Sequence, residues 1–271
     1  MEMKNVGKVH YLEPQLFTRA GISCHGFTTR HEGVSRPPYN SLNLGTNTLD
    51  SIHNVQGNRS LLARAFGTRI DKLVTVTQVH GTDLLVIDAP NPDYSHFRKL
   101  ECDGIITNQP GLMIGVCVAD CAPLILLDPV KRGVAALHAG WQGTAGKIAQ
   151  KGVDALVALF GSEPSDILAA VGPSIGRCCY EVDAPVKDAF SREGGCWGEY
   201  AVETADGKWQ LDLSLANVHQ LLEAGIPREN IETTELCVSC HLGHLKEAPA
   251  KTGELSRGGG CVATTLLDVG L

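Results

Sequence analysis

The 271-residue sequence lacks an excess of basic residues and lacks any long uninterrupted apolar run. Its 30 aspartates and glutamates outnumber 23 lysines and arginines, which gives a formal net charge of −7. General nucleic-acid binding needs a cationic surface that displaces counterions, so this balance argues against a nucleic-acid partner. The longest apolar region, residues 112–127, is interrupted by Gly115, Asp120 and Pro123 and falls short of the roughly 20 apolar residues of a membrane span.

No apolar segment typical of a signal peptide follows Met1, so we expect a cytoplasmic protein without a membrane partner. The ten cysteines are then the unusual feature of the composition. Disulfide frameworks are typical of short secreted domains, whereas a chain of this length buries roughly three quarters of its surface without them. We therefore expect reduced thiols, most of them packed as small hydrophobic side chains.

Neither a Pro/Ser-rich linker nor an internal repeat divides the sequence, and we predict a single domain over residues 1–271. Hydrophobic periodicity predicts more strands than helices, which indicates an α+β fold with mixed β-sheets. The predicted strands are residues 23–29, 73–79, 84–88, 112–118, 124–128, 134–137 and 167–171. The predicted helices are residues 54–66 with Asn54 or Asp50 as cap, 144–160, and 212–224 with Asp212 or Ser214 as cap and Gly225 as stop. We expect strands 73–79 and 84–88 to pair through the turn at 81–83, and surface loops at 89–99 and 243–260.

Three apolar segments end in a polar side chain that a glycine or proline soon follows, and these side chains are His80, Cys121 and His138. Strand ends present side chains into clefts. Two imidazoles and a thiolate suit zinc, and three protein ligands leave a fourth position open. Their wide separation matches no short zinc motif, and buried, hydrogen-bonded side chains are the alternative that each residue alone favours.

Cys121 also fits a nucleophile with His80 or His138 as its base, as in a metal-free cysteine hydrolase. Asp120 either orients a histidine, acts as an acid or base, or caps a turn. The sequence contains no Gly-x-Ser-x-Gly elbow and no His-Glu-x-x-His helix. The residues alone leave the metal site and the hydrolase open.

A glycine-rich turn at residues 140–147 follows His138 and enters the predicted helix. Gly140 and Gly143 would let an anion approach the free amides of the helix N-terminus, although the turn lacks the Walker A pattern. A tight strand-to-helix turn explains the same glycines. The cluster Cys237-Val238-Ser239-Cys240-His241 predicts either incidental thiols or a second zinc site with His244. Cys178-Cys179 is a poor disulfide pair, and we expect packing or incidental residues there.

A series of motifs follows the order found in one family. They are residues 27–30, 33–35, 41–45, 78–82, 103–107, 119–123, 138–143, 172–175 and 179–182. From about Gly26 to Cys240 the sequence resembles the laccase-domain family, whose members were once called multicopper polyphenol oxidases and are now regarded as purine nucleoside phosphorylases.

The resemblance implies an α+β fold with layered mixed sheets and a zinc site of His80, Cys121 and His138, with copper as the alternative metal. It implies phosphorolysis of adenosine, inosine and methylthioadenosine, with phosphate as co-substrate, and deamination of adenosine. It places Arg30 and Asn43 in family motifs, where they would bind substrate or brace a loop. Glu181 is a weaker candidate than Asp120 for the acid or base, with an exposed surface glutamate as the alternative.

Two departures from the family matter. Gln142 stands where the family has arginine, and at the C-terminus only Ser256-Arg257-Gly258 resembles the family's aromatic-Ser-Tyr-Arg segment. A copper-dependent laccase remains an alternative activity, although the absence of any His-x-His pair argues against a multicopper cluster. A non-catalytic binding protein is a further alternative, and the sequence does not indicate an oligomeric state.

Overall fold

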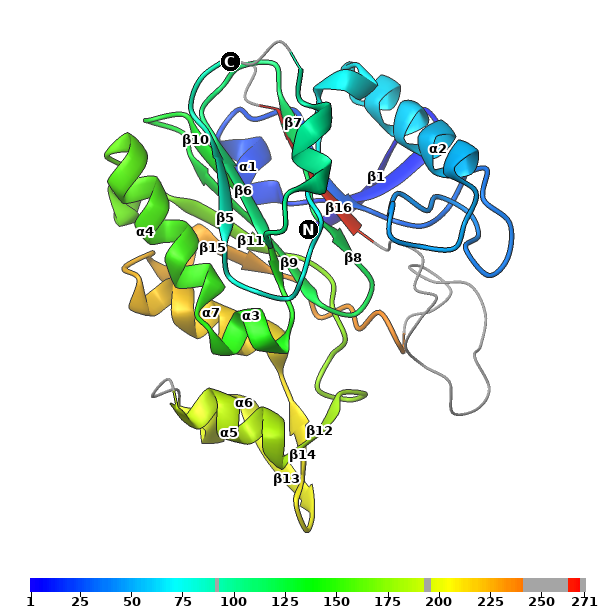
Figure 1. The fold of residues 1–271 in the computed structure, drawn as a ribbon. Coiled ribbons are helices and arrows are strands. Elements are labelled where there is room, and N and C mark those ends of the chain that lie inside the picture. Colours follow the sequence, from blue (N-terminus) through cyan, green and yellow to red (C-terminus); the bar gives the residue numbers. More distant parts are fainter. Residues whose placement is uncertain (91–92, 193–195, 241–262, 269–271) are drawn as a thin grey trace.

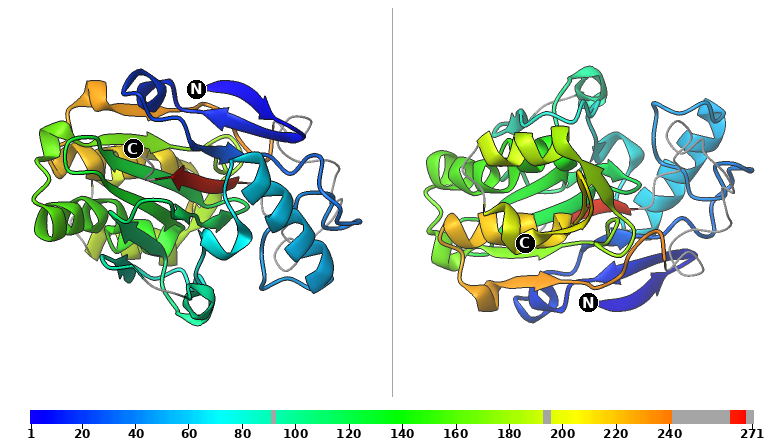
Figure 2. Two further views of the ribbon diagram at one scale, coloured as in Figure 1. Left: turned by 90° about the horizontal axis from the view of Figure 1, so that it is seen from above. Right: turned by 90° about the horizontal axis from the view of Figure 1, so that it is seen from below.

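The computed structural model describes residues 1–90, 93–192, 196–240 and 263–268. Within them two large β-sheets stack face to face, helices pack on the outer faces, and a small third sheet projects from one end (Figure 1, Figure 2). This arrangement confirms the predicted α+β fold with layered mixed sheets. The single domain over residues 1–271 stays a prediction.

A six-stranded sheet forms the centre of the molecule, in the order β15-β11-β9-β10-β6-β5. Its strands are β5 (Leu84–Ile87), β6 (Gly104–Thr107), β9 (Ala122–Asp128), β10 (Gly133–Ala139), β11 (Leu168–Val171) and β15 (Ile231–Thr233). The inner pairs are antiparallel, and the edge pairs β15/β11 and β5/β6 are parallel. Because β9 and β10 run antiparallel, with His138 opposite Pro123, the beginning of β9 lies beside the end of β10.

The second sheet has seven strands, in the order β1-β2-β3-β16-β7-β4 with β8 paired to β16. They are β1 (Glu2–Val6), β2 (Val9–Glu13), β3 (His25–Thr28), β4 (Leu73–Val74), β7 (Met113–Ile114), β8 (Cys117–Val118) and β16 (Ala263–Asp268). The predicted hairpin of 73–79 with 84–88 is wrong: β4 pairs with β7, while β5 belongs to the other sheet. The predicted strand 112–118 is two short strands, because β7 and β8 pair with different parts of β16.

Two hydrophobic cores lie on the two faces of the six-stranded sheet. Leu124 and Leu126 pack toward the helices, while the alternate residues Ile125 and Leu127 pack toward the seven-stranded sheet around Phe27. Successive side chains of a strand point to opposite faces, so a strand buried on both faces reads as a continuous apolar run. A third core fills the space between the seven-stranded sheet and α2.

Helices cover the layered sheets from both sides. The α-helices are α1 (Gln15–Arg19), α2 (Ile52–Ala65), α3 (Trp141–Ala145), α4 (Ile148–Phe160), α5 (Ala184–Arg192), α6 (Trp197–Tyr200) and α7 (Leu213–Glu223). Short 3-10 helices span Ile70–Lys72, Ser95–Lys99, Pro164–Asp166 and Arg228–Asn230. The third sheet, in the order β12-β14-β13, packs with α5 and α6 and comprises β12 (Glu181–Asp183), β13 (Ala201–Ala205) and β14 (Lys208–Leu211).

The helix boundaries confirm one prediction and correct two. Asp212 caps α7 by accepting the Leu215 N–H at 2.9 Å, and Gly225 follows the helix with a φ of +93°. The predicted helix 144–160 is two helices, because Lys147 adopts a left-handed φ of +63° between α3 and α4. At α2 the N-cap is Ser51, without a side-chain cap, rather than Asn54 or Asp50.

No helix within the described residues combines the length and the apolar character that crossing a membrane requires. The cytoplasmic location stays a prediction. The loop predicted at 89–99 contains the 3-10 helix Ser95–Lys99. Most of the loop predicted at 243–260, with the Ser256-Arg257-Gly258 segment, lies outside the described residues.

Candidate active site

The structure brings His80, Cys121 and His138 together. Each offers one ligand atom, and the three atoms all lie within 4.8 Å of one another. The two imidazole rings lie edge to face, with centroids 4.9 Å apart and an interplanar angle of 78°. Cys121 directly precedes β9 and His138 lies near the end of β10, so the antiparallel register of these strands places the thiol beside the imidazole.

Asp103 is the buried group that holds both histidines. One carboxylate oxygen lies 2.8 Å from His138 Nδ1 and accepts the His80 N–H at 2.9 Å. The other oxygen accepts the N–H groups of Val79 and Gly81 at 3.2 and 2.6 Å. These bonds fix the turn in which His80 has a φ of +62°. An ionised carboxylate only accepts hydrogen bonds, so Nδ1 of His138 carries the proton and Nε2 is left for a metal ion.

The electrostatics favour a thiolate at Cys121. Burial raises the pKa of this thiol, but hydrogen bonds with His138 and His80 outweigh burial and lower the pKa to about 7. Burial likewise opposes a charged His138, yet its bonds to Asp103 and Cys121 raise its pKa to about 9. For Asp103, burial raises the pKa, and bonds from His138 and the Gly81 N–H more than offset it. Without a metal, Cys121 and His138 therefore form a thiolate–imidazolium pair near neutral pH.

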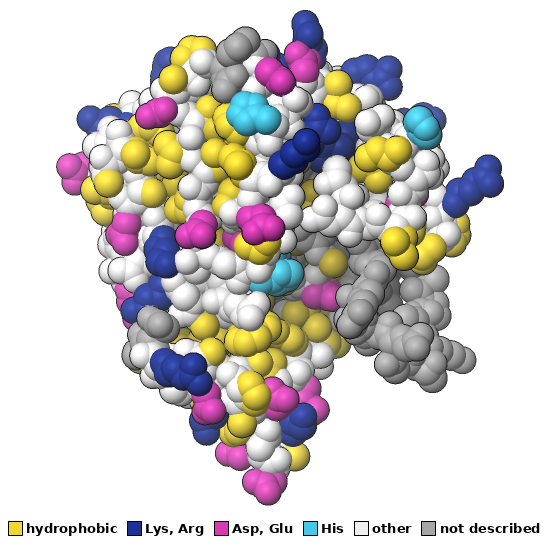
Figure 3. Space-filling model, viewed as in Figure 1, with side chains coloured by type: hydrophobic (Ala, Val, Ile, Leu, Met, Phe, Trp, Pro, Cys, Tyr) yellow, Lys and Arg dark blue, Asp and Glu magenta, His cyan; other side chains and the backbone are white. Residues whose placement is uncertain are grey.

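The cluster opens into a cavity of about 370 Å³. In Figure 3 a histidine and an acidic side chain lie beside a hollow near the middle of the molecular face. The cavity is lined by residues 44–48, Arg59, Thr75, Val76, Gln78, His80, Cys117, Val118, Ala119, Asp120, Cys121 and His138. Its volume falls in the range of small-molecule sites, which start at roughly 300 Å³.

Two predicted site glycines pack directly against the cluster. A Cβ on Gly140 would lie 3.0 Å from both Cys121 Sγ and His80 Cδ2, and a Cβ on Gly143 would lie 3.0 Å from the Gly81 carbonyl oxygen. Both glycines thus permit close approach of the backbone to the cluster. The Gln142 side chain is exposed, and a role of this turn in phosphate binding stays a prediction.

The other predicted residues differ in whether they line the cavity. Asp120 lines it, and its backbone carbonyl accepts the Ile175 N–H at 2.8 Å. Arg30 is buried and donates to the Asn40 carbonyl, so it braces a loop. Asn43 is also buried.

The amide of Asn43 donates to Thr48 and Asp50 and accepts the Gly45 N–H, which shapes the part of the cavity wall at residues 44–48. Glu181 is exposed on β12 and is absent from the described lining. Compared with Arg30 and Glu181, Asn43 is therefore the residue linked to the cavity, through the wall that it shapes.

Two residues of the site carried no predicted role. Asp103 opens the motif 103–107 but is separated in sequence from the histidines that it binds, so only the fold reveals its function. Arg59 on α2 is buried in the cavity wall and donates to the Leu44 carbonyl at 3.2 Å and to Thr75 Oγ1 at 2.9 Å. The sequence gives no local signal for Arg59, because an arginine on a helix is usually exposed.

A second group of ligands consists of Cys178, Cys179, Cys237 and Cys240, whose sulfur atoms also lie within 4.8 Å of one another. The sequence predicts packing or incidental residues for the first two; Cys178 is exposed and Cys179 half-buried, so packing does not explain Cys178. The prediction grouped the last two with His241 and His244, which lie outside the described residues.

Two imidazoles and a thiolate at a cavity, with a buried carboxylate behind one imidazole, are typical of a catalytic metal centre. Comparison with known proteins gives the family: residues 24–252 match the multi-copper polyphenol oxidoreductase laccase family, and the chain belongs to it.

The relatives confirm both the predicted family and the prediction of an enzyme. Purine nucleoside phosphorylase YlmD of Bacillus subtilis is 35% identical over 238 residues, which cover 85% of each chain. Adenosine deaminase RL5 of an unknown prokaryotic organism is 35% identical over 224 residues, covering 79% of this chain and 83% of its own. The crystal structure of YlmD from Geobacillus stearothermophilus matches with a TM-score of 0.85 at 31% identity, and covers 98% of this chain and 97% of that one.

Proposed function

We propose that the chain is a zinc-dependent purine nucleoside phosphorylase that cleaves adenosine, inosine and methylthioadenosine with phosphate and also deaminates adenosine. The observation that carries the proposal is the convergence of His80, Cys121 and His138 at a cavity of about 370 Å³. The names of the relatives, purine nucleoside phosphorylase and adenosine deaminase, support the two activities.

The donor set fits zinc, because a thiolate and two imidazoles are ligands that this ion prefers and three of them leave one position open. When bound, the ion would act as a Lewis acid toward an oxygen atom of water or substrate. Asp103 would fix the tautomer of His138 through Nδ1 and so aim Nε2 at the ion. Copper is the alternative metal. Among the described residues the candidate ligand groups are two histidines with one cysteine, and four cysteines, and neither is the histidine-rich set that a multicopper oxidase needs.

Phosphorolysis also needs a site for the attacking phosphate. Arg59 supplies the permanent positive charge among the described residues that line the cavity, and its guanidinium matches phosphate oxygens in pairs. This placement offers the anion a partner despite Gln142 at the position where the family has arginine. Asp120, half-buried in the cavity wall, would hold or release the proton that moves between substrate and solvent.

A metal-free cysteine hydrolase is the second candidate function, and one observation favours it. The pKa of Cys121, about 7, gives a thiolate beside an imidazolium at neutral pH, as in cysteine nucleophiles. The metal content of the active protein separates the two candidates. A hydrolase would keep full activity after chelation, whereas the phosphorylase would lose it.

The test is an assay of adenosine and inosine with and without phosphate, in which free base and ammonia are followed separately. We expect free base from both nucleosides only when phosphate is present, and ammonia from adenosine in either case. Zinc-loaded protein that releases neither product would contradict the proposal. Cys196→Ala is a suitable control, because Cys196 is an exposed cysteine outside both ligand groups.

A further inference from the structure

The second group of cysteines is built from two short turns that are far apart in the sequence. Cys178 and Cys179 lie in the turn after β11, and Cys240 ends the turn that begins after Cys237. Cys240 Sγ lies 3.3 Å from Cys178 Sγ and 3.0 Å from Cys179 Sγ, and all four sulfur atoms lie within 4.8 Å of one another. In a tetrahedral zinc site with Zn–S bonds of about 2.3 Å, the sulfur atoms lie about 3.8 Å from one another. Two sulfur–sulfur distances in this group, 3.3 and 3.0 Å, lie below that value, and the upper limit of 4.8 Å lies above it.

The backbone holds the two turns together. Ser174 and Cys237 form a parallel bridge, and the Val238 N–H donates to the Ser174 carbonyl at 3.0 Å. The Gly176 N–H also donates to Cys237 Sγ at 3.2 Å. Backbone N–H groups aimed at a sulfur stabilise a thiolate, as outer partners of metal ligands do.

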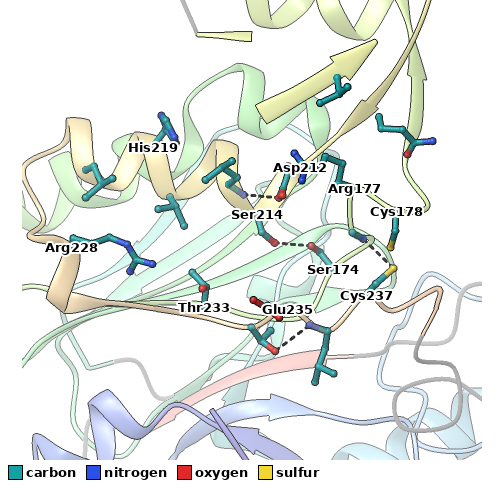
Figure 4. A pocket seen from close by; sticks show the side chains of 18 of the residues that line it. Ser174, Arg177, Cys178, Asp212, Ser214, His219, Arg228, Thr233, Glu235 and Cys237 are labelled. Carbon is teal, nitrogen blue, oxygen red and sulfur yellow. Dashed lines mark hydrogen bonds between the residues drawn. The ribbon is translucent and has the colours of Figure 1, made fainter. Parts of the chain in front are cut away.

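The two turns lie in close contact at Gly176. A Cβ at Gly176 would lie 3.1 Å from Cys237 Cβ, so a larger residue would push the turns apart. Figure 4 shows Cys178 and Cys237 side by side at one end of a second cavity, of about 1050 Å³. The two turns therefore meet at a wall shared with this cavity.

A disulfide explains the group less well. Adjacent cysteines such as Cys178 and Cys179 bridge only with strain. None of the four forms a disulfide in the structure. Among the described residues the group consists of four thiols from two turns, a set of soft ligands of the kind that selects zinc.

We propose that Cys178, Cys179, Cys237 and Cys240 bind a structural zinc ion that joins the turn after β11 to the turn after Cys237. The proposal does not depend on the proposed function. It has a consequence for the active site, because the Ile175 N–H, in the first of the two joined segments, donates to the Asp120 carbonyl beside Cys121. Removing the structural zinc should loosen this contact and lower activity without removing the metal at His80, Cys121 and His138.

The test counts metal in the full-length protein, purified in reducing buffer with zinc and then desalted. We expect two zinc ions per chain in the unchanged protein and in Cys196→Ala, and one in Cys121→Ala. The double variant Cys237→Ser/Cys240→Ser should also hold one zinc ion. Zinc-free Cys121→Ala protein, or two zinc ions in the double variant, would overturn the proposal.

A second readout does not require the double variant to fold. Cys121→Ala reconstituted with cobalt should show the strong sulfur-to-metal absorption of a tetrahedral thiolate site, since the active-site thiolate is gone. Absence of this absorption would overturn the proposal, as would iron in place of zinc in the same variant. Because this arm is independent of nucleoside turnover, its failure is distinguishable from failure of the proposed function.

Discussion

The carboxylate of Asp103 lies 2.8 Å from Nδ1 of His138, and both side chains are buried. The same carboxylate oxygen accepts the N–H of His80. One buried anion therefore orients one imidazole through its ring and the other through its backbone. The geometry of the cluster depends on this residue although it offers no ligand atom of its own to the group.

Asp103→Asn should weaken zinc binding at the cluster by roughly 10- to 100-fold, the usual cost of losing an outer partner of a ligand. The amide keeps the shape of the carboxylate but removes the charge that holds the Nδ1 proton on His138. Chelator competition, with Cys237→Ser/Cys240→Ser as background, would measure the affinity of the cluster alone. Asp83→Asn is the control, since Asp83 is an exposed carboxylate on the neighbouring turn. Equal affinities of the two variants would count against the role of Asp103.

In the metal-free protein, the rate of alkylation of Cys121 should rise with pH, with a midpoint near pH 7. The pKa of this thiol is lowered, so the reactive thiolate is present above about pH 7 and is lost as the pH falls through that value. Cys196 is an internal control, because nearby Glu199 raises its pKa and its midpoint should lie above the usual range. Mass spectrometry of the chelator-treated protein would follow both sites. A Cys121 midpoint as high as that of Cys196 would disprove the thiolate–imidazolium pair.

Gly140→Ala should impair the cluster through contact alone. The new Cβ would lie 3.0 Å from Cys121 Sγ and from His80 Cδ2, and overpacking of this kind costs about 1–3 kcal/mol. We expect weaker zinc binding and slower turnover, measured by chelator competition and the nucleoside assay. Gly198→Ala is the matched control, because a Cβ there meets nothing within 4 Å. If both variants behave like the unchanged protein, the backbone does not confine the cluster.

Arg59→Met should raise the KM for phosphate in phosphorolysis at least tenfold, the loss expected for a charge-assisted hydrogen bond of about 1.5–3 kcal/mol. Deamination of adenosine uses no phosphate and should change less. Arg64→Met, an exposed substitution on the same helix, serves as control. Equal losses in both reactions would show that Arg59 supports the fold of the cavity wall and not the anion.

The parts of the fold that follow from local pattern could be predicted from the sequence. The buried strands β9, β10 and β11 read as apolar runs, and the cap at Asp212 and the stop at Gly225 follow from short-range chemistry. The hairpin predicted between 73–79 and 84–88 failed because the second sheet recruits β4 through β7. Strand pairing over such distances is decided by the packing of whole sheets, which local periodicity does not contain.

The candidate site likewise contains residues that the local sequence indicates and residues that only the fold reveals. His80, Cys121 and His138 were found because each ends an apolar segment, and the structure confirms that they meet. Asp103, Arg59 and the meeting of Cys178 and Cys179 with Cys237 and Cys240 were missed because the partners lie far apart in the sequence. In the sequence, Cys178-Cys179 and Cys237-x-x-Cys240 are two separate pairs. The fold places them side by side through the bridge between Ser174 and Cys237.

The most direct test of the proposed active site is the zinc content and phosphate-dependent turnover of adenosine in three proteins: unchanged, Cys121→Ala and Cys196→Ala. The unchanged and Cys196→Ala proteins should release adenine at equal rates, and Cys121→Ala should lose one zinc ion per chain together with its turnover. Full turnover by Cys121→Ala with that zinc ion absent would contradict the assignment of His80, Cys121 and His138 as the catalytic metal site.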